Sequence, residues 1–285
     1  MKRESFGSRL GFILVSAGCA IGIGNVWKFP YICGAYGGAA FILIYLCFLV
    51  ILGIPVLVAE FAVGRGSHTS VAKCFDKLAP AGSCWKPLKF IGIIGCYMLM
   101  MFYTTVGGWM IYYCVKSLRG DFVGATPEAV TQSFSDMLGN APTMMLWMVI
   151  ICLIGFAVCF MGLQNGIEKI SKVMMSALLI IMVILAVHSV MMEGAGEGIR
   201  FYLIPDFQKI KEAGVGNVVF AALSQSFFTL SIGIGAMLIF GSYLDKSRSL
   251  TGEAVSITVL DTFVALTAGF IIIPACFSYG IQPDA

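Results

Sequence analysis

The chain has 285 residues, of which 59% are hydrophobic and 12% are charged, and its formal net charge is +3. Soluble domains carry roughly 25% charged residues, so the chain has too few charges to cover the surface of a water-soluble protein. Its richness in aliphatic and aromatic residues excludes intrinsic disorder. A net charge this small gives no sign of nucleic-acid binding. The remaining class is a membrane protein that crosses the bilayer several times.

Long apolar runs indicate helices rather than the alternating strands of an outer-membrane barrel. A helix needs about 20 apolar residues to span a bilayer. Seven segments meet this requirement, and each carries at most one charged residue or histidine. They are residues 10–36, 39–63, 90–115, 141–163, 173–192, 213–244 and 254–283. The predicted fold is therefore an all-α polytopic membrane protein with seven transmembrane helices.

No Pro/Ser-rich linker divides the chain, so residues 1–285 are expected to form a single domain. Residues 66–89 are predicted to be a loop with a short helix. We expect polar loops at 117–140 and 193–212 and a tight turn at 163–172.

Basic residues are distributed unevenly between the two sides of the predicted membrane. With the N-terminus inside, twelve Lys and Arg residues fall in inside segments and five in outside segments. This asymmetry follows the positive-inside rule, so we expect a cytoplasmic N-terminus in the cell (inner) membrane.

Two predicted spans contain the same tripeptide near the middle of the membrane. Gly22-Ile23-Gly24 lies in the first span and Gly233-Ile234-Gly235 in the sixth, and the two spans run in opposite directions. Matching interruptions in oppositely oriented helices are typical of inverted-repeat transporters. Residues 1–192 would form the first five-helix repeat, and residues 213–285 the first two helices of the second. The alternative is that these glycines only allow close helix packing.

A helix broken inside the membrane exposes backbone N–H and C=O groups where no water can bind them. The broken segment is stable only if a ligand or a buried side chain binds those groups. Helix N-termini attract anions, and free carbonyl oxygens attract cations. A zwitterion together with sodium would satisfy both requirements.

The first broken span also resembles a family signature. Residues 18–31 (GCAIGIGNVWKFPY) are similar to the first helix of the sodium:neurotransmitter symporters, which have the leucine-transporter fold. Residues 37–41, 53–65 and 226–235 agree with the same family in order and spacing, and the resemblance covers the whole chain.

This resemblance implies two sodium sites. The first would be formed by the carbonyl oxygen of Ala20, the amide oxygen of Asn25, Thr229 and Asp261. The family often has asparagine where Asp261 stands. The other interpretation of Asp261 is a buried structural acid, although acids inside membranes are usually functional.

The second sodium site would use the carbonyl oxygens of Gly18 and Ile21. Its remaining ligands in the family lie on a later helix that this sequence does not contain. We therefore expect the second site to be incomplete here.

The family substrate site implies a bound amino acid. The resemblance places eight residues around it: Gly22, Ile23, Gly24, Leu99, Tyr103, Phe228, Ser231 and Ile234. The amides of Ile23 and Gly24 and the hydroxyl of Tyr103 would bind the carboxylate. The alternative for Tyr103 is a tyrosine that serves only at the membrane interface or in helix packing.

Glycine at position 22 favours an amino acid over a monoamine, because monoamine carriers of the family have an aspartate there. The side chains of Leu99, Phe228 and Ile234 would make the pocket apolar. We therefore expect a hydrophobic or aromatic amino acid as the substrate.

The resemblance also implies gates on both sides of the substrate site. Lys28 and Gln225 would close the outer side, whereas Arg3, Phe6 and Tyr243 would close the inner side. The alternatives are that Lys28 extends towards the membrane surface and that Arg3 is an ordinary inside charge. Glu60 is expected to bind unwound backbone rather than substrate.

Chloride-dependent relatives bind chloride near the positions of Tyr45, Gln225, Thr229 and Ala265. The carboxylate of Asp261 would supply the compensating negative charge here, so chloride is not expected to be required. Membrane lipid is the other expected partner, and the sequence does not indicate an oligomeric state.

The predicted function is sodium-coupled symport of an amino acid by alternating access. The alternative is a non-transporting amino-acid-binding or accessory protein of the same fold, and no motif points to an enzyme. The second repeat has only two of its five helices, so we interpret the 285 residues as a fragment that does not transport by itself.

Overall fold

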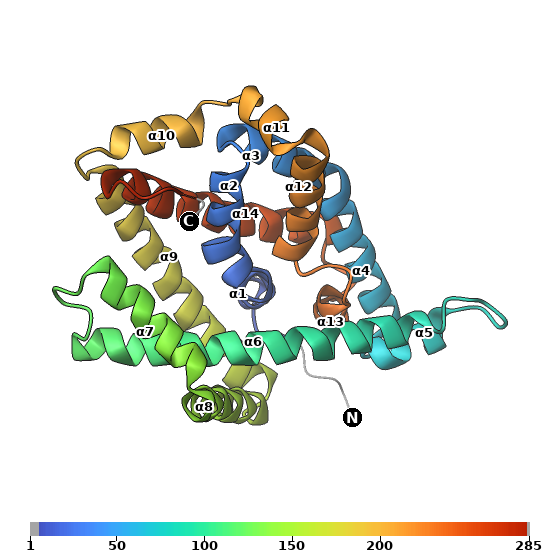
Figure 1. Ribbon diagram of the computed structural model, residues 1–285. Coiled ribbons are helices and arrows are strands. Elements are labelled where there is room, and N and C mark those ends of the chain that lie inside the picture. Colours follow the sequence, from blue (N-terminus) through green and yellow to red (C-terminus); the bar gives the residue numbers. More distant parts are fainter. Residues whose placement is uncertain (1–5, 284–285) are drawn as a thin grey trace.

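The computed structural model describes residues 6–283, and every regular element in that range is helical, as the sequence predicts (Figure 1). The first half of the described chain contains α1 (Arg9–Ala20), η1 (Gly24–Lys28), α2 (Phe29–Ala35), α3 (Ala39–Phe48), η2 (Leu49–Gly53), α4 (Ile54–Ser67), α5 (Val71–Leu78), α6 (Leu88–Arg119) and α7 (Pro127–Gly139). The second half contains α8 (Ala141–Phe160), η3 (Leu163–Glu168), α9 (Lys169–Val190), α10 (Ala195–Leu203), α11 (Phe207–Ala213), α12 (Val215–Thr229), α13 (Ala236–Gly241) and α14 (Leu250–Ser278). The η elements are short π-helical turns, most of them within longer helices.

Five helices of the described chain are long and apolar enough to cross a membrane. They are Ala39–Ser67, Leu88–Arg119, Ala141–Phe160, Leu163–Val190 and Leu250–Ser278. A sixth crossing is obtained if α1 and the bent continuation Gly24–Ala35 count as one span. The 15-residue helix α12 is too short to count by itself, so the number seven stays a prediction.

The first predicted break is confirmed. Helix α1 ends at Ala20, where Ile21 adopts an extended conformation (φ −71°, ψ 108°) that cannot continue the helix. The chain resumes as η1 at Gly24, and the two parts are bent by 57° relative to each other. The Gly-Ile-Gly sequence lies at this bend, because glycine has little resistance to leaving the helical conformation.

The second predicted break is also confirmed. Helix α12 ends at Thr229 and α13 begins only at Ala236. Between them Ser231, Gly233 and Gly235 have φ values of +50°, +91° and +81°, a region that glycine tolerates and other residues rarely adopt. The N–H of Gly233 donates a 2.6 Å hydrogen bond to Oε1 of Glu60 on α4. The expected binding of unwound backbone by Glu60 is therefore confirmed.

The tight turn predicted at residues 163–172 is wrong. Leu163–Glu168 is already helical and continues directly into α9, so only Met161 and Gly162, the latter with φ +84°, separate α8 from this helix. Gly166 explains the close approach of the two helices, since a β-carbon at that position would lie 2.9 Å from Cβ of Met161.

The segments at 117–140 and 193–212, predicted as polar loops, contain helices α7, α10 and most of α11. The hydroxyl of Thr126 caps α7 by accepting a hydrogen bond from the N–H of Ala129. Asp206 caps α11 in the same way through the N–H of Gln208. Such capping side chains stabilise short helices at the surface. The short helix expected within 66–89 is present as α5.

The two broken helices lie in the middle of the structure. Figure 1 shows α1 and α2 at the centre, with α9 on one side, α12 and α4 on the other and α14 crossing behind them. Contacts of α1 with α9 and α14, and of α12 with α3, support this arrangement. The surrounding helices therefore enclose both breaks, and α14 places Asp261 beside them.

Candidate functional site

Polar side chains from three helices meet where the two breaks come together. Nδ2 of Asn25 lies 2.9 Å from Oγ1 of Thr229 and 2.8 Å from Oδ1 of Asp261. The hydroxyl of Thr229 donates a 2.8 Å hydrogen bond to Oδ2 of the same carboxylate. All three side chains are completely buried. Burial of charged and polar groups costs free energy unless they are paired. Here the three buried side chains are paired with one another.

The donor set of this cluster fits sodium. A carboxylate, an amide, a hydroxyl and nearby backbone carbonyls provide the hard oxygen ligands that such cations prefer. Ala20, the fourth predicted ligand, is the last residue of α1, whose final carbonyls have no following helical N–H. The amide nitrogen of Asn25 faces the carboxylate, so coordination by its oxygen requires the amide group to rotate by about half a turn.

The two predicted ligands of the second sodium site lie on the same segment. Gly18 is in the last turn of α1, and Ile21 follows its end. A β-carbon at Gly18 would lie 3.2 Å from Sδ of Met175 on α9, so this part of α1 packs closely against that helix. Both carbonyl oxygens lie where α1 ends at the first break. Their role as sodium ligands stays a prediction.

The two breaks are also joined directly. Nε2 of Gln225 donates a 2.9 Å hydrogen bond to the carbonyl oxygen of Gly24. The hydroxyl of Ser231 donates a 3.0 Å hydrogen bond to the carbonyl oxygen of Cys19. These contacts connect α12 and its unwound continuation to both sides of the first break, so the two halves of the site cannot move independently while the bonds last.

The residues expected near chloride in other members are buried around the same cluster. Tyr45, Gln225 and Ala265 are completely inaccessible to solvent. Oε1 of Gln225 has no hydrogen-bond partner among the described residues, whereas the hydroxyl of Tyr45 lies close to the side chains of Thr229 and Thr262. A buried amide oxygen without a partner is unusual.

A cavity of about 230 Å³ lies beside the unwound part of the second break. Five of the eight predicted substrate residues line it: Leu99, Tyr103, Phe228, Ser231 and Ile234. Ser224, Phe227 and Ile232 line it as well and were not predicted. Helical spacing could have indicated two of them, since positions 224, 227, 228 and 231 share one helix face.

The remaining three predicted substrate residues lie at the first break. A β-carbon at Gly22 would lie 3.7 Å from Cε1 of Tyr103, whereas one at Gly24 would lie 2.6 Å from Cε1 of Phe228. The backbone of the first break is thus in close contact with two cavity residues. Ile23 lines a neighbouring cavity of about 260 Å³ together with Lys28 and Phe228.

One aromatic ring separates these two cavities. Phe228 lines both of them, and Nζ of Lys28 lies 4.2 Å from the centre of its ring. An ammonium group over an aromatic face is attracted by the ring. Lys28 therefore holds the ring in place on one side of the substrate cavity, which is where the sequence predicts a gate.

Residues predicted for the other gate lie at the end of the bundle where the described chain begins. The rings of Phe6 and Tyr243 are 5.8 Å apart and nearly perpendicular, and Phe6 also packs on Phe12 at 5.4 Å. The edge-to-face geometry is a favourable one for aromatic pairs. Arg3, the third residue of this group, lies outside the described residues.

Comparison with known proteins identifies the family. Residues 3–133 and 128–279 match the sodium:neurotransmitter symporter family. The chain belongs to this family. The symporter signature predicted from residues 18–31 is therefore confirmed, and the relatives are transporters rather than enzymes.

Two bacterial members of the symporter family match nearly the whole chain. An uncharacterized sodium-dependent transporter of Bacillus subtilis, YhdH, is 36% identical over 99% of this chain. One from Haemophilus influenzae is 33% identical over all of it. The chain spans 62% and 63% of the length of these two proteins.

A solved structure has the same fold. The crystal structure of MhsT in complex with L-phenylalanine superposes with a TM-score of 0.90 at 38% identity, covering 99% of this chain and 63% of MhsT. The chain is thus a multi-pass membrane protein with the fold of a transporter.

Proposed function

We propose that the chain binds sodium and a hydrophobic or aromatic amino acid where its two broken helices meet, as part of a sodium-coupled symporter. The observation that carries this proposal is the buried group Asn25, Thr229 and Asp261, which lies directly beside the cavity lined by Phe228 and Ser231. An ion site next to a substrate cavity allows the substrate to complete the coordination of the ion.

An amino acid suits the chemistry of this cavity. Gly22 leaves room near the hydroxyl of Tyr103, and no acidic side chain of the described residues lines the cavity to neutralise a lone amine. The backbone amides of Ile23 and Gly24 would bind the carboxylate, and Leu99 and Ile234 would contact an apolar side chain. MhsT, which has the same fold, was crystallised with L-phenylalanine, and this supports an aromatic substrate.

Sodium and substrate would be coupled through shared contacts. A substrate carboxylate near sodium site one raises the affinity for the ion, and the ion raises the affinity for the substrate by the same factor. The N-terminus would lie in the cytoplasm and the chain in the cell (inner) membrane. A sodium gradient directed into the cell would then drive uptake of the amino acid. The carbonyls of Gly18 and Ile21 would contribute to a second sodium site, as the resemblance implies.

Chloride would not be required for this function. Asp261 supplies a fixed negative charge where chloride-dependent relatives use the ion, and it lies within hydrogen-bond distance of Thr229. The buried hydroxyl of Tyr45 and the amide oxygen of Gln225 line the same region. Membrane lipid surrounds the apolar outer helices, for which the exposed aliphatic side chains of α8 and α9 are suited.

Ile234 is expected to set the size of the accepted side chain. It lines the substrate cavity on one side and a larger cavity of about 460 Å³ on the other. Ile234→Phe should fill the substrate cavity and weaken binding of L-phenylalanine roughly tenfold more than binding of L-alanine, because shape changes in apolar pockets cost about 1–3 kcal/mol. Competition binding with a radiolabelled amino acid measures the ratio.

Ile234→Val serves as the control for this prediction, since it keeps the branched shape and removes one methyl group. Its ratio of L-phenylalanine to L-alanine affinity should stay close to that of the unchanged chain. Equal weakening of both amino acids by Ile234→Phe would show that residue 234 does not contact the substrate side chain.

Uptake separates a symporter from a non-transporting binding protein. The chain, and in parallel the chain joined to the part of YhdH beyond the matched region, would be reconstituted in proteoliposomes with radiolabelled L-phenylalanine. A symporter accumulates the amino acid in the joined form only with an inward sodium gradient. Sodium-dependent binding without accumulation in either form would favour the non-transporting alternative.

A further inference from the structure

A cavity separate from the substrate and sodium sites lies between the end of α6, helix α7 and the start of α8. Its volume is about 390 Å³, within the range of about 300–1,000 Å³ that small-molecule sites occupy. Among the described residues, it shares no lining side chain with the substrate cavity. It is therefore a candidate for a second binding site.

One face of α7 forms a wall of this cavity. Phe134 anchors the helix to α6, because its ring lies 5.9 Å from that of Trp109 and 6.3 Å from that of Tyr113. The lining positions recur at intervals of three and four residues, so they share one side of the helix. They are Ala129, Gln132, Ser133, Asp136, Met137 and, at the end of the helix, Asn140. Packed helices rather than a free loop thus shape the cavity.

Lys116 provides a positive charge from α6. Its Nζ donates a 2.7 Å hydrogen bond to Oγ of Ser133 and lies 5.5 Å and 5.6 Å from the ring centres of Tyr112 and Phe122. Aromatic faces attract an ammonium group, so these contacts hold it in place. A lysine ammonium has three N–H groups, and two of them stay free for an anion.

Asp136 provides a negative charge from α7. Its Oδ1 accepts a 2.7 Å hydrogen bond from Nε2 of Gln132, one turn earlier on the same helix. The other oxygen, Oδ2, has no hydrogen-bond partner among the described residues. Asp136 can therefore accept a hydrogen bond from a cation in the cavity.

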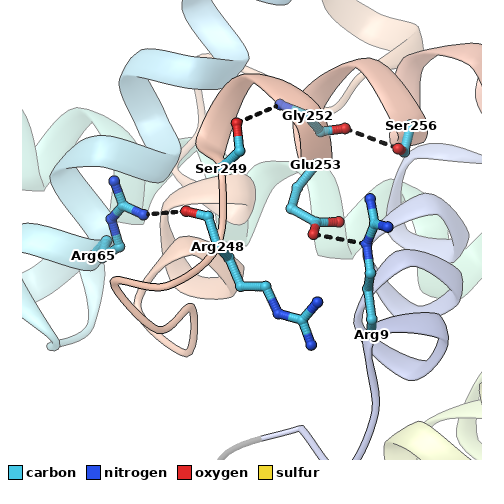
Figure 2. A network of polar contacts seen from close by, with 7 residues as sticks. All are labelled: Arg9, Arg65, Arg248, Ser249, Gly252, Glu253 and Ser256. Atoms are coloured by element: carbon cyan, nitrogen blue, oxygen red, sulfur yellow. Dashed lines mark hydrogen bonds and ion pairs between the residues drawn. The ribbon is translucent and has the colours of Figure 1, made fainter.

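Lys116 and Asp136 line the same cavity, yet no ion pair joins them in the part of the chain that the structure describes. Carboxylates near the start of α1 are paired instead. These pairs are Arg9 with Glu253 at 2.9 Å (Figure 2) and Lys172 with Glu168 at 2.7 Å, and Glu168 also accepts a hydrogen bond from the N–H of Gly7. The two charges of the cavity are thus available to a ligand that carries both opposite charges.

The other lining residues narrow the class of this ligand. Seven of the nine carry polar side chains, whereas the substrate cavity has no charged lining residue among those described. A metal ion is not suited to the donors, since no group of three His, Cys, Asp or Glu side chains in the described chain could hold one. Hydrogen bonds to ionised groups are stronger than neutral ones, so a small zwitterion with a polar side chain fits best.

We propose that this cavity binds a polar, uncharged amino acid, whose carboxylate contacts Lys116 and whose amino group contacts Asp136. The site differs in place and in ligand class from the apolar substrate cavity, and it does not depend on the proposed transport function. With a cytoplasmic N-terminus, residues 117–140 lie outside the cell, so the site would meet amino acids of the medium.

Binding is measured by isothermal titration of the purified chain with L-glutamine, L-asparagine and L-serine. The titrations are made in sodium with saturating L-phenylalanine, so that the substrate cavity is filled. We expect saturable binding of at least one of the three at millimolar concentration. Ala129→Phe should abolish it, because the ring fills the cavity without changing either charge.

Lys116→Gln and Asp136→Asn separate the two charges of the ligand. Each should weaken binding of the amino acid about tenfold, the effect of one hydrogen bond to a charged group. Lys116→Gln should also weaken competition by the N-acetylated amino acid, which keeps only the carboxylate. Asp136→Asn should instead weaken competition by the amino acid amide, which keeps only the ammonium group.

Arg119→Gln and Glu128→Gln are the matched controls, since they make the same charge changes on α6 and α7 at exposed residues that do not line the cavity. Both should leave the affinity within a factor of about two, because exposed charges contribute little. Gel filtration checks that every variant elutes as one folded species.

The proposal is overturned if none of the three amino acids binds saturably, or if L-phenylalanine displaces the one that does. It is also overturned if the control variants weaken binding as much as Lys116→Gln and Asp136→Asn. An N-acetylated amino acid that binds as tightly as the free one would show a site for anions alone, which contradicts the role of Asp136.

Discussion

Asp261→Ala is expected to abolish the sodium dependence of amino-acid binding. The carboxylate is completely buried, accepts hydrogen bonds from Asn25 and Thr229 and provides the negative charge of the predicted first sodium site. Its removal should weaken sodium binding by roughly hundredfold, which corresponds to about 3 kcal/mol for a buried charged contact. Titration of radiolabelled amino-acid binding with sodium, at constant ionic strength, measures the loss.

Asp261→Asn is the matched variant because it keeps the size of the side chain and removes only the charge. We expect it to bind sodium more weakly than the unchanged chain and to regain affinity when chloride replaces a larger anion. Asn25→Ala should weaken sodium and amino-acid binding together. If Asp261→Ala bound sodium as well as the unchanged chain, Asp261 would be a structural acid and the first site would lie elsewhere.

Gly241→Ala is expected to cause a large loss of stability. Its β-carbon would lie 2.6 Å from Cα and 2.7 Å from the carbonyl oxygen of Phe61, backbone atoms that cannot turn away. Overpacking of this kind costs about 1–3 kcal/mol, and for a chain of this size roughly 2 kcal/mol lowers the unfolding midpoint by about 4–8 °C. Thermal unfolding in detergent, followed by loss of the monodisperse gel-filtration peak, measures it.

Gly155→Ala is the control for this prediction. Gly155 lies within α8, and nothing comes within 4 Å of the position its β-carbon would take. The midpoint of this variant should equal or exceed that of the unchanged chain, since alanine favours helices over glycine. Equal midpoints for the two variants would show that α4 and α13 are not packed backbone to backbone.

Local sequence predicted the two helix breaks because glycine acts on its own backbone. Gly-Ile-Gly occurs at both breaks, and the structure leaves the helical conformation there. Glu60 could also be assigned, because an acid in an apolar span needs donors and the unwound backbone is rich in them. Each of these predictions used the residue types of a single segment and did not require the identity of its partner in the fold.

The contacts at the start of α1 could not be predicted in the same way. Arg9 and Glu253 are 244 positions apart in the chain, and each looks like an ordinary charge near a membrane surface. Glu168 lies in the stretch predicted as a tight turn, although it is helical in the structure. Partners of this kind are set by the tertiary arrangement, which the local pattern does not contain.

The central claim is that sodium and an amino acid bind next to each other where the broken helices meet. Its most direct test is the affinity of the purified chain for radiolabelled L-phenylalanine in sodium and in potassium at equal ionic strength, together with the sodium affinity with and without the amino acid. We expect each ligand to raise the affinity for the other by the same factor. Equal L-phenylalanine affinity in sodium and in potassium would contradict the claim.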